Sequence, residues 1–193
     1  MNTVHFEGVT DINPERTSKE GIMLICRKIA SEKGLKALNM RAVAGECGIA
    51  LGTLYNYFSD KEELLISTIS SLWQDFFRLP RKSRKKPLFS NYVETLFGNV
   101  RKRISAYPDF LTTHSSVIAN KNRALNAMER CTAEIRGMLL TVLREDSAVV
   151  SGAFGEKLME ESFVEFVLDS IIMLLMQNKP CDALVAVIGR TIY

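Results

Sequence analysis

The chain has 193 residues, of which 47% are hydrophobic and 24% are charged, and its formal net charge is +3. A chain of this length can bury one sizeable core plus a smaller second unit. No uncharged apolar run reaches about 18 residues, the length that spans a membrane, and the polar N-terminus has no signal-peptide core. We therefore expect a cytoplasmic protein with no membrane partner.

The charged residues are spread unevenly along the chain. Residues 1–87 carry 14 Lys and Arg against 10 Asp and Glu, whereas residues 88–193 carry 11 against 12. The positive excess in the first part suits a nucleic-acid partner. None of the four cysteines and two histidines stands at the spacing of a metal or redox motif. Because a phosphate-binding glycine loop and a nucleophile elbow are also absent from the sequence, we expect no metal, no cofactor and no enzyme activity.

The first pattern in chain order is a polar arm followed by an amphipathic helix. Residues 1–16 have mixed polarity and no sustained period, so we expect a flexible arm. Thr17 or Ser18 can cap the helix that follows, with Thr17 and Glu20 at capping-box spacing. Gly34 is the predicted end of this helix.

Two short helical patterns joined by a glycine turn come next. Asn39 can cap the first, whose apolar residues recur at i, i+3, i+4 and i+7 and share one face: Met40, Val43, Ala44 and Cys47. Gly48 suits the left-handed position just past a helix C-terminus. The second helix, residues 51–57, uses few residues for a core, chiefly Leu54 and the following Phe58. This spacing predicts a helix-turn-helix.

The second helix leaves one face free to contact a partner. Its residues there offer a bare backbone, hydroxyl and amide donors and flat rings: Gly52, Thr53, Tyr55, Asn56 and Tyr57. Ser59 or Asp60 caps a long helix that continues to Leu79, and Lys61 lies in its first turn. A cation there opposes the helix dipole, so we interpret Lys61 and the free amides as a seat for a phosphate. Tyr57 also suits a position in the small core.

The run from Ala42 to Leu65, with Gly34 and the apolar helix before it, resembles the DNA-binding domain of the TetR family of bacterial transcriptional regulators. Its most recognisable part reads GTLYNYFSDKEELL. The chain departs from the family pattern at Ala50, where Ser or Thr usually caps the recognition helix. It departs again at Leu51, where a polar or basic residue is common. Leu51 can meet a thymine methyl group or pack internally.

The resemblance implies an all-α protein of about nine helices in two domains. Residues 17–65 would form the DNA-binding domain, with its last helix continuing to residue 79. Residues 80–193 would form a larger domain for ligand binding and dimerisation. The basic run of residues 81–86 at the boundary is either a solvated loop or an additional attraction to DNA phosphate.

The helical patterns continue to the end of the chain. The long helix has one apolar stripe, which contains Leu65, Ile69, Leu72, Trp73 and Phe76. Five further helices are expected, over residues 89–107, 108–120, 124–144, 155–177 and 181–192. Pro108 fits the first turn of its helix.

The predicted helix over residues 155–177 is apolar on more than one face, so one face needs a cover outside the domain core. The resemblance implies that the last two helices of each subunit form a homodimer interface. The residues assigned to it are Phe163, Phe166, Val167, Ile171 and Leu174. The alternative is a wholly internal helix.

These features predict a homodimeric regulator that binds double-stranded DNA at a palindromic operator and is most simply a repressor released by a small molecule. The residues expected to contact DNA are Asn39, Arg41, Leu51, Gly52, Thr53, Tyr55, Tyr57 and Lys61. The residues expected to line the site of the unknown effector are Trp73, Phe97 and His114. The alternative is constitutive DNA binding, with the larger domain as a protein-interaction or architectural module.

Overall fold

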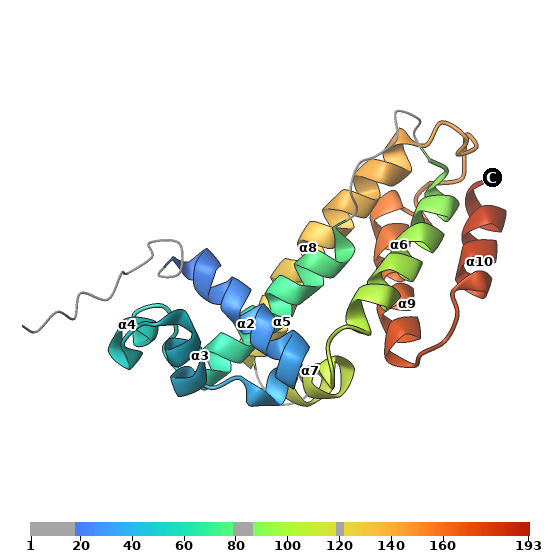
Figure 1. The fold of residues 1–193 in the computed structure, drawn as a ribbon. Coiled ribbons are helices and arrows are strands. Elements are labelled where there is room, and N and C mark those ends of the chain that lie inside the picture. The colour runs from blue at the N-terminus through green and yellow to red at the C-terminus, as the bar shows by residue number, and fades with distance from the viewer. Residues whose placement is uncertain (1–17, 79–86, 119–121) are drawn as a thin grey trace, which may run out of the picture.

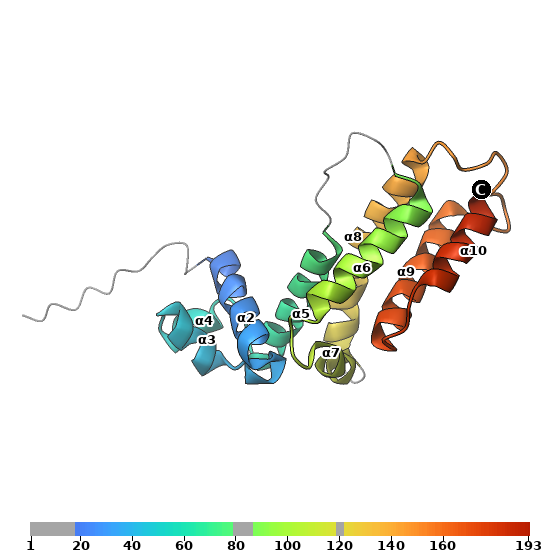
Figure 2. The ribbon, with the colours of Figure 1, turned by 45° about the vertical axis from the view of Figure 1, so that its right-hand side comes forward.

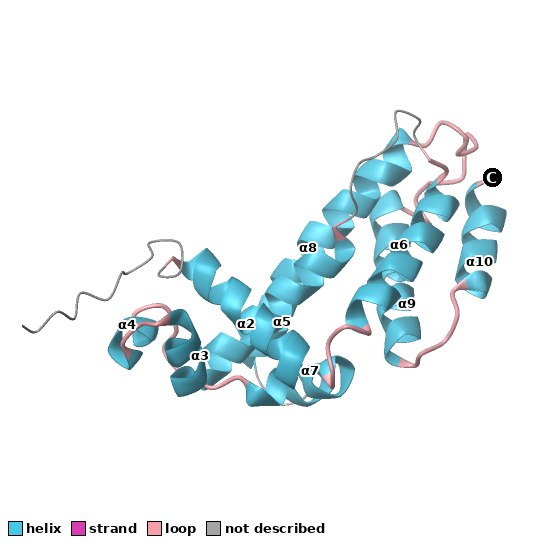
Figure 3. Cartoon of the chain, viewed as in Figure 1, coloured by secondary structure: helices cyan, strands magenta, loops and turns pink. Residues whose placement is uncertain are grey.

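The computed structural model describes residues 18–78, 87–118 and 122–193, and within these ranges it contains nine α-helices and one 3-10 helix. The first elements are α2 (Lys19–Lys33), η1 (Leu35–Ala37), α3 (Met40–Cys47), α4 (Leu51–Tyr55) and α5 (Lys61–Phe77). The others are α6 (Phe89–Ile104), α7 (Phe110–Ile118), α8 (Asn122–Glu145), α9 (Glu160–Met176) and α10 (Asp182–Ile192). The predicted all-α fold is confirmed (Figure 3). The expected N-terminal arm and the basic run of residues 81–86 lie outside the described residues.

The helices form two groups that α5 and α8 connect. Figure 1 shows α2, α3 and α4 together at one end of the molecule and α6, α9 and α10 at the other, and the rotated view in Figure 2 agrees. α5 packs against α2 in the first group, against α6 in the second, and along α8. A movement of α5 would therefore be felt at both ends.

Local caps explain where the first helices begin and end. The Ser18 side chain accepts a hydrogen bond from the amide three residues later at 3.0 Å, and Asn39 does the same at the start of α3 at 2.9 Å. Gly34, with φ 79° and ψ 161°, ends α2, and Gly48, with φ 69° and ψ 31°, ends α3. Side chains other than glycine rarely adopt these conformations. The predicted caps and stops at Asn39, Gly34 and Gly48 are confirmed, and of the two candidates for the first cap Ser18 is the one seen.

A reciprocal capping box begins α5. The Asp60 carboxylate accepts a hydrogen bond from the Glu63 amide at 2.7 Å, and the Glu63 carboxylate accepts one from the Ser59 amide at 2.8 Å. The helix ends at Phe77, so its predicted end at Leu79 was too late. Leu65 is only partly buried, contrary to the predicted stripe, because Leu64 takes the core position in this turn.

The helices α7 and α9 begin later than predicted. α7 begins at Phe110 and not at Pro108, because Asp109 has a φ of 58°, which a right-handed helix cannot contain. α9 begins at Glu160 and not at residue 155. The preceding residues form a tight turn in which Gly155 and Leu158 exchange two backbone hydrogen bonds, at 2.9 and 3.1 Å.

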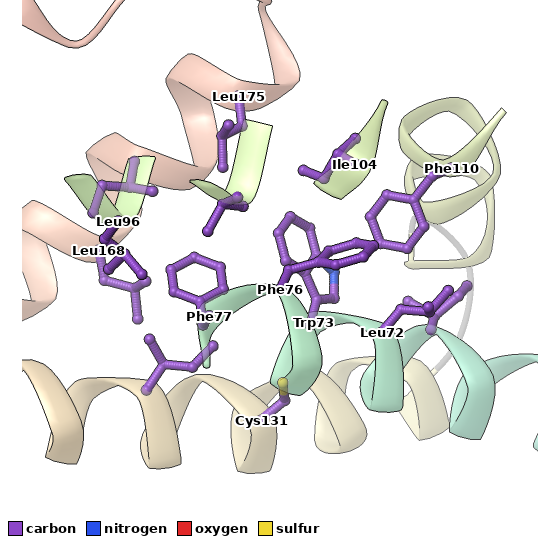
Figure 4. Close-up of a cluster of buried hydrophobic side chains, with 14 of the residues drawn as sticks. Leu72, Trp73, Phe76, Phe77, Leu96, Ile104, Phe110, Cys131, Leu168 and Leu175 are labelled. Carbon is purple, nitrogen blue, oxygen red and sulfur yellow. The ribbon is translucent and has the colours of Figure 1, made fainter. Parts of the chain in front are cut away.

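The core where α5 meets the second group is aromatic (Figure 4). Trp73 and Phe76 of α5 make edge-on contacts with Phe110 of α7, at ring-centroid distances of 5.2 and 5.1 Å. Figure 4 also shows side chains of α6, α8 and α9 around Phe77: Leu96, Cys131, Leu168 and Leu175. Edge-to-face aromatic pairs add about 0.5–1.5 kcal/mol each to the free energy of area burial. This core fixes the C-terminal half of α5 to four helices.

A buried carboxylate closes the far end of the second group. Asp146, just after α8, accepts hydrogen bonds from the Phe89 amide at 2.6 Å and from the Tyr193 hydroxyl at 2.5 Å. It also accepts one from the Ala148 amide at 3.0 Å. Leu88 gives α6 no side-chain cap, so Asp146 caps this helix from a distant part of the chain. We call Asp146, Phe89 and Tyr193 the carboxylate clasp.

Candidate nucleic-acid interface

The recognition helix α4 is held from one side only. Leu54 and the following Phe58 are fully buried, at 0% exposure, whereas Tyr55 is 50% exposed. Gly52 is exposed, and a Cβ added to it would meet nothing within 4 Å. Thr53 is partly buried. Gly52 and Tyr55 therefore lie on a face of α4 that a DNA groove can reach, because the buried Leu54 and Phe58 anchor the opposite side.

Leu51, the first residue of α4, and Tyr57, two residues after its end, are neither fully buried nor fully exposed. Both are partly buried and pack against the hydrophobic core. For Leu51 this favours internal packing over a purely outward contact with a thymine methyl group. For Tyr57 it supports the alternative of an aromatic residue in the small core, with the rest of its surface still open to solvent.

The predicted phosphate seat at the start of α5 is only half available. Lys61 is exposed in the first turn of this helix. The amide of Glu63, however, already bonds to Asp60, whose carboxylate also accepts a hydrogen bond from Arg123 at 2.9 Å. The Glu63 amide, followed by Arg123, holds the pKa of Asp60 below its usual value, so this carboxylate is charged at neutral pH. A phosphate would therefore bind the Lys61 ammonium group and not the amides that Asp60 occupies.

The start of α3 presents a cation beside the recognition helix. Asn39 uses its side-chain oxygen for the cap, and its amide nitrogen donates to the carbonyl of Ala37 at 3.2 Å. Arg41 is exposed and lines a shallow groove of about 440 Å³ together with Lys33. Lys33 was not predicted from the sequence, because no local pattern in α2 shows that the C-terminal end of this helix lies near the start of α3.

The three residues predicted to line an effector site lie in packed core. Trp73, Phe97 and His114 are all buried, and Trp73 and His114 touch edge to face with their centroids 5.3 Å apart. Phe97 lies on α6 and makes no ring contact with either among the described aromatic pairs. Burial lowers the pKa of His114 to about 4.

A hollow with a volume of about 530 Å³ lies elsewhere, between α2, α5 and α8. We call it the α2–α5–α8 cleft. It is lined by hydroxyls of α5, by charged groups of α8 and by an apolar floor, and none of the three predicted ligand residues lines it. The signal that could have revealed it is the polar set Ser67, Ser70 and Ser71 at helical spacing in an otherwise apolar helix.

Most of the residues assigned to a dimer interface face the chain's own core. Phe163, Val167 and Ile171 are buried within the single chain, so their assignment to an interface was wrong. Leu174 is partly buried and packs against the same core. Phe166 is 51% exposed. Met173, two helical turns later on the same side of α9, is 56% exposed. The apolar pattern of α9 indicated two apolar faces, but it did not indicate which of them is buried in the core of the same chain.

Neither a membrane-spanning helix nor a metal-binding cluster of side chains occurs within residues 18–78, 87–118 and 122–193. No helix in these ranges is long and apolar enough to cross a bilayer. No group of three or more His, Cys, Asp or Glu side chains in the described part of the chain is placed to hold a metal ion.

The fold and the geometry of α3 and α4 define a helix-turn-helix protein. Residues 26–68 match the family model described as bacterial regulatory proteins, tetR family. This N-terminal region therefore resembles the DNA-binding domain of the TetR family.

The curated relatives match mainly in this N-terminal region. The transcriptional repressor KstR of Mycobacterium tuberculosis is 39% identical over 69 residues, which are 36% of this chain and 30% of that protein. KstR of Rhodococcus jostii is 33% identical over 75 residues, which are 39% of this chain and 34% of that protein. The chain therefore spans about a third of the length of these relatives.

Solved structures resemble the whole fold at low sequence identity. BioQ in complex with its double-stranded DNA operator has a TM-score of 0.55 at 18% identity, covering 83% of this chain and 85% of that one. The fatty acid degradation regulator FadR of Bacillus halodurans has a TM-score of 0.57 at 16% identity, covering 87% and 86%. These likenesses show that the second group of helices also has the arrangement found in such regulators.

The unfilled cap of α4 leads to a first prediction. Ala50 stands at the N-cap with extended backbone and no side-chain hydrogen bond. Ala50→Ser should raise the free energy of unfolding by about 1 kcal/mol, because its hydroxyl can accept from a free amide of the first turn. Urea unfolding followed by circular dichroism measures the change. Ala133→Ser, on the exposed middle of α8, is the control and should lower stability by a few tenths of a kcal/mol. Equal effects of both substitutions would contradict the capping argument.

Proposed function

We propose that the chain is a sequence-specific DNA-binding transcriptional regulator that acts as a repressor. The observation that carries this is the exposed face of α4, with Gly52 and Tyr55 outward while Leu54 and Phe58 hold the helix from behind. Arg41 and Lys61 supply exposed cations on either side of this face in sequence. The family match over residues 26–68 and the fold likeness to operator-bound BioQ support the proposal.

Selection of bound duplexes from a random DNA library by the purified protein tests this function. A homodimer with two recognition helices should enrich a palindrome whose half-sites are about 34–36 Å apart or a multiple of this distance. No enrichment at moderate salt would contradict sequence-specific binding. An enriched motif without two-fold symmetry would keep DNA binding but remove the paired arrangement.

Lys61 should contribute to DNA affinity without reading sequence. Lys61→Ala is expected to weaken binding to the operator and to unrelated duplexes about equally, and to reduce the slope of log K against log salt by about 0.9. Fluorescence anisotropy titrations at several salt concentrations measure both effects. Lys102→Ala, in the exposed last turn of α6 far from α4, is the matched control. An unchanged slope for Lys61→Ala would remove this residue from the phosphate contacts.

Homodimerisation is proposed to use the outer face of α9 together with α10. Phe166 and Met173 on α9 and Val187 on α10 are each about half exposed or more. The two α9 residues are seven apart and so lie on one side of the helix, in line with Met159 just before it. In a two-fold symmetric interface this apolar strip would meet its own copy.

Phe166→Glu should weaken this dimer at least tenfold, because the symmetry places two added carboxylates in one apolar interface. Sedimentation velocity over a concentration series gives the dissociation constant. Leu24→Glu, at a 58% exposed apolar position on α2, is the control for a new surface charge. The same dissociation constant for Phe166→Glu and wild type would contradict the proposed face.

We also propose that a small molecule releases the protein from its operator. An effector must favour the conformation that DNA does not, and a hundredfold loss of operator affinity requires about 2.7 kcal/mol of coupling. The alternative of constitutive DNA binding with an interaction module is favoured by one observation: Trp73, Phe97 and His114 leave no described hollow around them. A thermal-shift screen separates the two, because a ligand of the native state raises the melting temperature.

A further inference from the structure

The α2–α5–α8 cleft holds polar groups that the described part of the protein leaves without partners. Ser70 Oγ is inaccessible to solvent and has no hydrogen-bond partner. Neither the Ser67 hydroxyl nor the Arg130 guanidinium makes a hydrogen bond or ion pair within the described residues. A buried hydroxyl without a partner costs folding free energy, and Ser70 Oγ forms part of the cleft wall. The partly exposed Ser67 and the exposed Arg130 are the groups that a ligand can reach.

Of the three cations that line the cleft, Lys19, Arg123 and Arg130, two are left without an ion pair among the described residues. Glu134 accepts a hydrogen bond from Gln74 at 2.8 Å, and Glu63 is bound in the capping box of α5. Arg123 is paired with Asp60 at 2.9 Å. Lys19, whose ammonium group lies 5.6 Å from the centroid of the Phe58 ring, and Arg130 remain. Of these two, the Arg130 guanidinium can bind a carboxylate through two parallel hydrogen bonds.

The floor of the cleft is apolar. Met23, Ile66 and Cys131 line it beneath the polar rim and are largely buried. A volume of about 530 Å³ lies within the range of sites that take organic molecules of moderate size. The cleft therefore combines a surface for a hydrocarbon body with a hydroxyl partner and the cations Lys19 and Arg130.

We propose that the α2–α5–α8 cleft binds an organic acid with one carboxylate and an apolar, aromatic-sized body. Arg130 pairs with the carboxylate, Lys19 adds a second positive charge, Ser67 bonds to one of the oxygen atoms, and the body lies over Met23 and Ile66. As the effector site of a regulator, this assignment rests on the proposed function, whereas binding itself does not. An inorganic oxyanion shares the charge and acceptor oxygens but has nothing to place on the apolar floor.

The position of the cleft provides a route to the DNA-binding face. Arg123 lines the cleft and bonds to Asp60, the N-cap of α5, five residues after the end of α4. A carboxylate bound at Arg130 lies two turns along α8 from Arg123, and its negative charge weakens the attraction between Arg123 and Asp60. The acid therefore changes the contact between α8 and the turn that joins α4 to α5.

Binding is tested with defined probes on the full chain. The probes are 3-phenylpropanoate and 3-(4-hydroxyphenyl)propanoate, the two corresponding primary amides, and inorganic phosphate, each at millimolar concentration. Isothermal titration calorimetry and thermal shift should show binding of the acids and much weaker binding of the amides. Arg130→Gln should weaken binding of the acids at least tenfold, as expected for loss of a charge-assisted pair. Glu134→Gln should strengthen it severalfold, since a competing negative charge is removed.

Arg136→Gln is the matched control, because Arg136 lies on the same helix outside the cleft and pairs with Glu129. It should leave acid binding unchanged once its own effect on melting temperature is subtracted. Ser67→Ala should weaken acid binding severalfold while the free protein stays about as stable as wild type, which a merely structural hydroxyl would not produce. Absence of binding by both acids, or equal binding by wild type and Arg130→Gln, would overturn the proposal. Binding of phosphate alone would overturn the assignment to an organic acid.

The effect of the acid on operator affinity is measured separately from the binding of the acid to the protein. Addition of the bound acid to the protein–operator complex should lower operator affinity in fluorescence anisotropy for wild type but not for Arg130→Gln. If the DNA selection yields no operator while the acids still bind through Arg130, the cleft assignment stands and the regulator function fails. If an operator is found but neither acid binds, the regulator function stands and the cleft assignment fails.

Discussion

His114→Phe should stabilise the protein and flatten the acid side of its stability profile. Burial lowers the pKa of His114 from 6.5 to about 4, and neither ring nitrogen has a hydrogen-bond partner within the described residues. The ring is 6% exposed, lies edge-on to Trp73 and stacks on Phe110 at a centroid distance of 6.0 Å. A phenyl ring suits these neighbours and has no nitrogen to satisfy.

The sign of the pH effect follows from the two protonation states. Between pH 6.5 and about 4 the unfolded chain binds a proton at His114 and the folded chain does not. The contribution of neutral His114 to stability is therefore fully present above pH 6.5 and is lost as the pH falls towards 4. At 1.36 kcal/mol for each pH unit the loss is about 3 kcal/mol. His114→Phe removes this part of the acid destabilisation.

Urea unfolding at fixed protein concentration and at pH 7, 6, 5 and 4.5 measures the difference between variant and wild type. His114→Asn is the control, since it does not titrate but keeps buried polar atoms. It should flatten the same part of the profile without the gain at pH 7. Parallel profiles for wild type and His114→Phe would show that the imidazole is not responsible for the acid loss.

Features set by neighbouring residues could be predicted from the sequence. The caps at Asn39 and Asp60 and the glycine stop at Gly48 depend on atoms within three or four residues, so the sequence alone locates them. The buried side of the recognition helix is equally local, because Leu54 and Phe58 are four residues apart. Hence the helix-turn-helix and the open face of α4 were predictable.

Features that depend on distant segments could not be predicted in this way. The apolar pattern of α9 does not say that Phe163 meets the rings of Phe89 and Phe154 inside the same chain while Phe166 faces outward. Asp109 breaks the helical pattern at Pro108 through a backbone conformation that composition does not reveal. The α2–α5–α8 cleft arises only when three separated helices come together, which is why a sequence-based choice of effector residues fell on the aromatic core.

Asp146→Ala should lower the free energy of unfolding by about 3 kcal/mol, because hydrogen bonds to a charged, buried acceptor are worth about 1.5–3 kcal/mol each and the donors left behind are buried. The hydrogen bonds that are lost are those of the carboxylate clasp. Phe89 is fully buried, so its amide has no access to water as a substitute partner. Asp146→Asn keeps an acceptor oxygen and should lose about half as much. Ser147→Ala, at the exposed neighbouring position, should change little.

The clasp also explains a second part of the acid response. Burial alone would raise the pKa of Asp146, but the hydrogen bonds from Tyr193, Phe89 and Ala148 outweigh it and hold the pKa below its ordinary value. The stabilisation is present above the ordinary carboxyl pKa near 3.8 and is lost as the pH falls through the lower folded value. This loss occurs at lower pH than that of His114, so the two substitutions should flatten different parts of one profile.

The clasp should matter for assembly as well as for stability. Tyr193 ends α10, and the Val150 amide bonds to the carbonyl of Ile192 at 2.9 Å, so the end of α10 is held by the segment after α8. Loss of Asp146 leaves the Tyr193 hydroxyl with only the long hydrogen bond from the Ser90 amide at 3.3 Å, which loosens the end of α10 beside α9. Sedimentation velocity on Asp146→Ala at neutral pH should therefore show a weaker dimer, while Ala148→Ser should not. An Asp146→Ala protein that is less stable but dimerises like wild type would show that the clasp positions α6 and leaves the α9–α10 face unaffected.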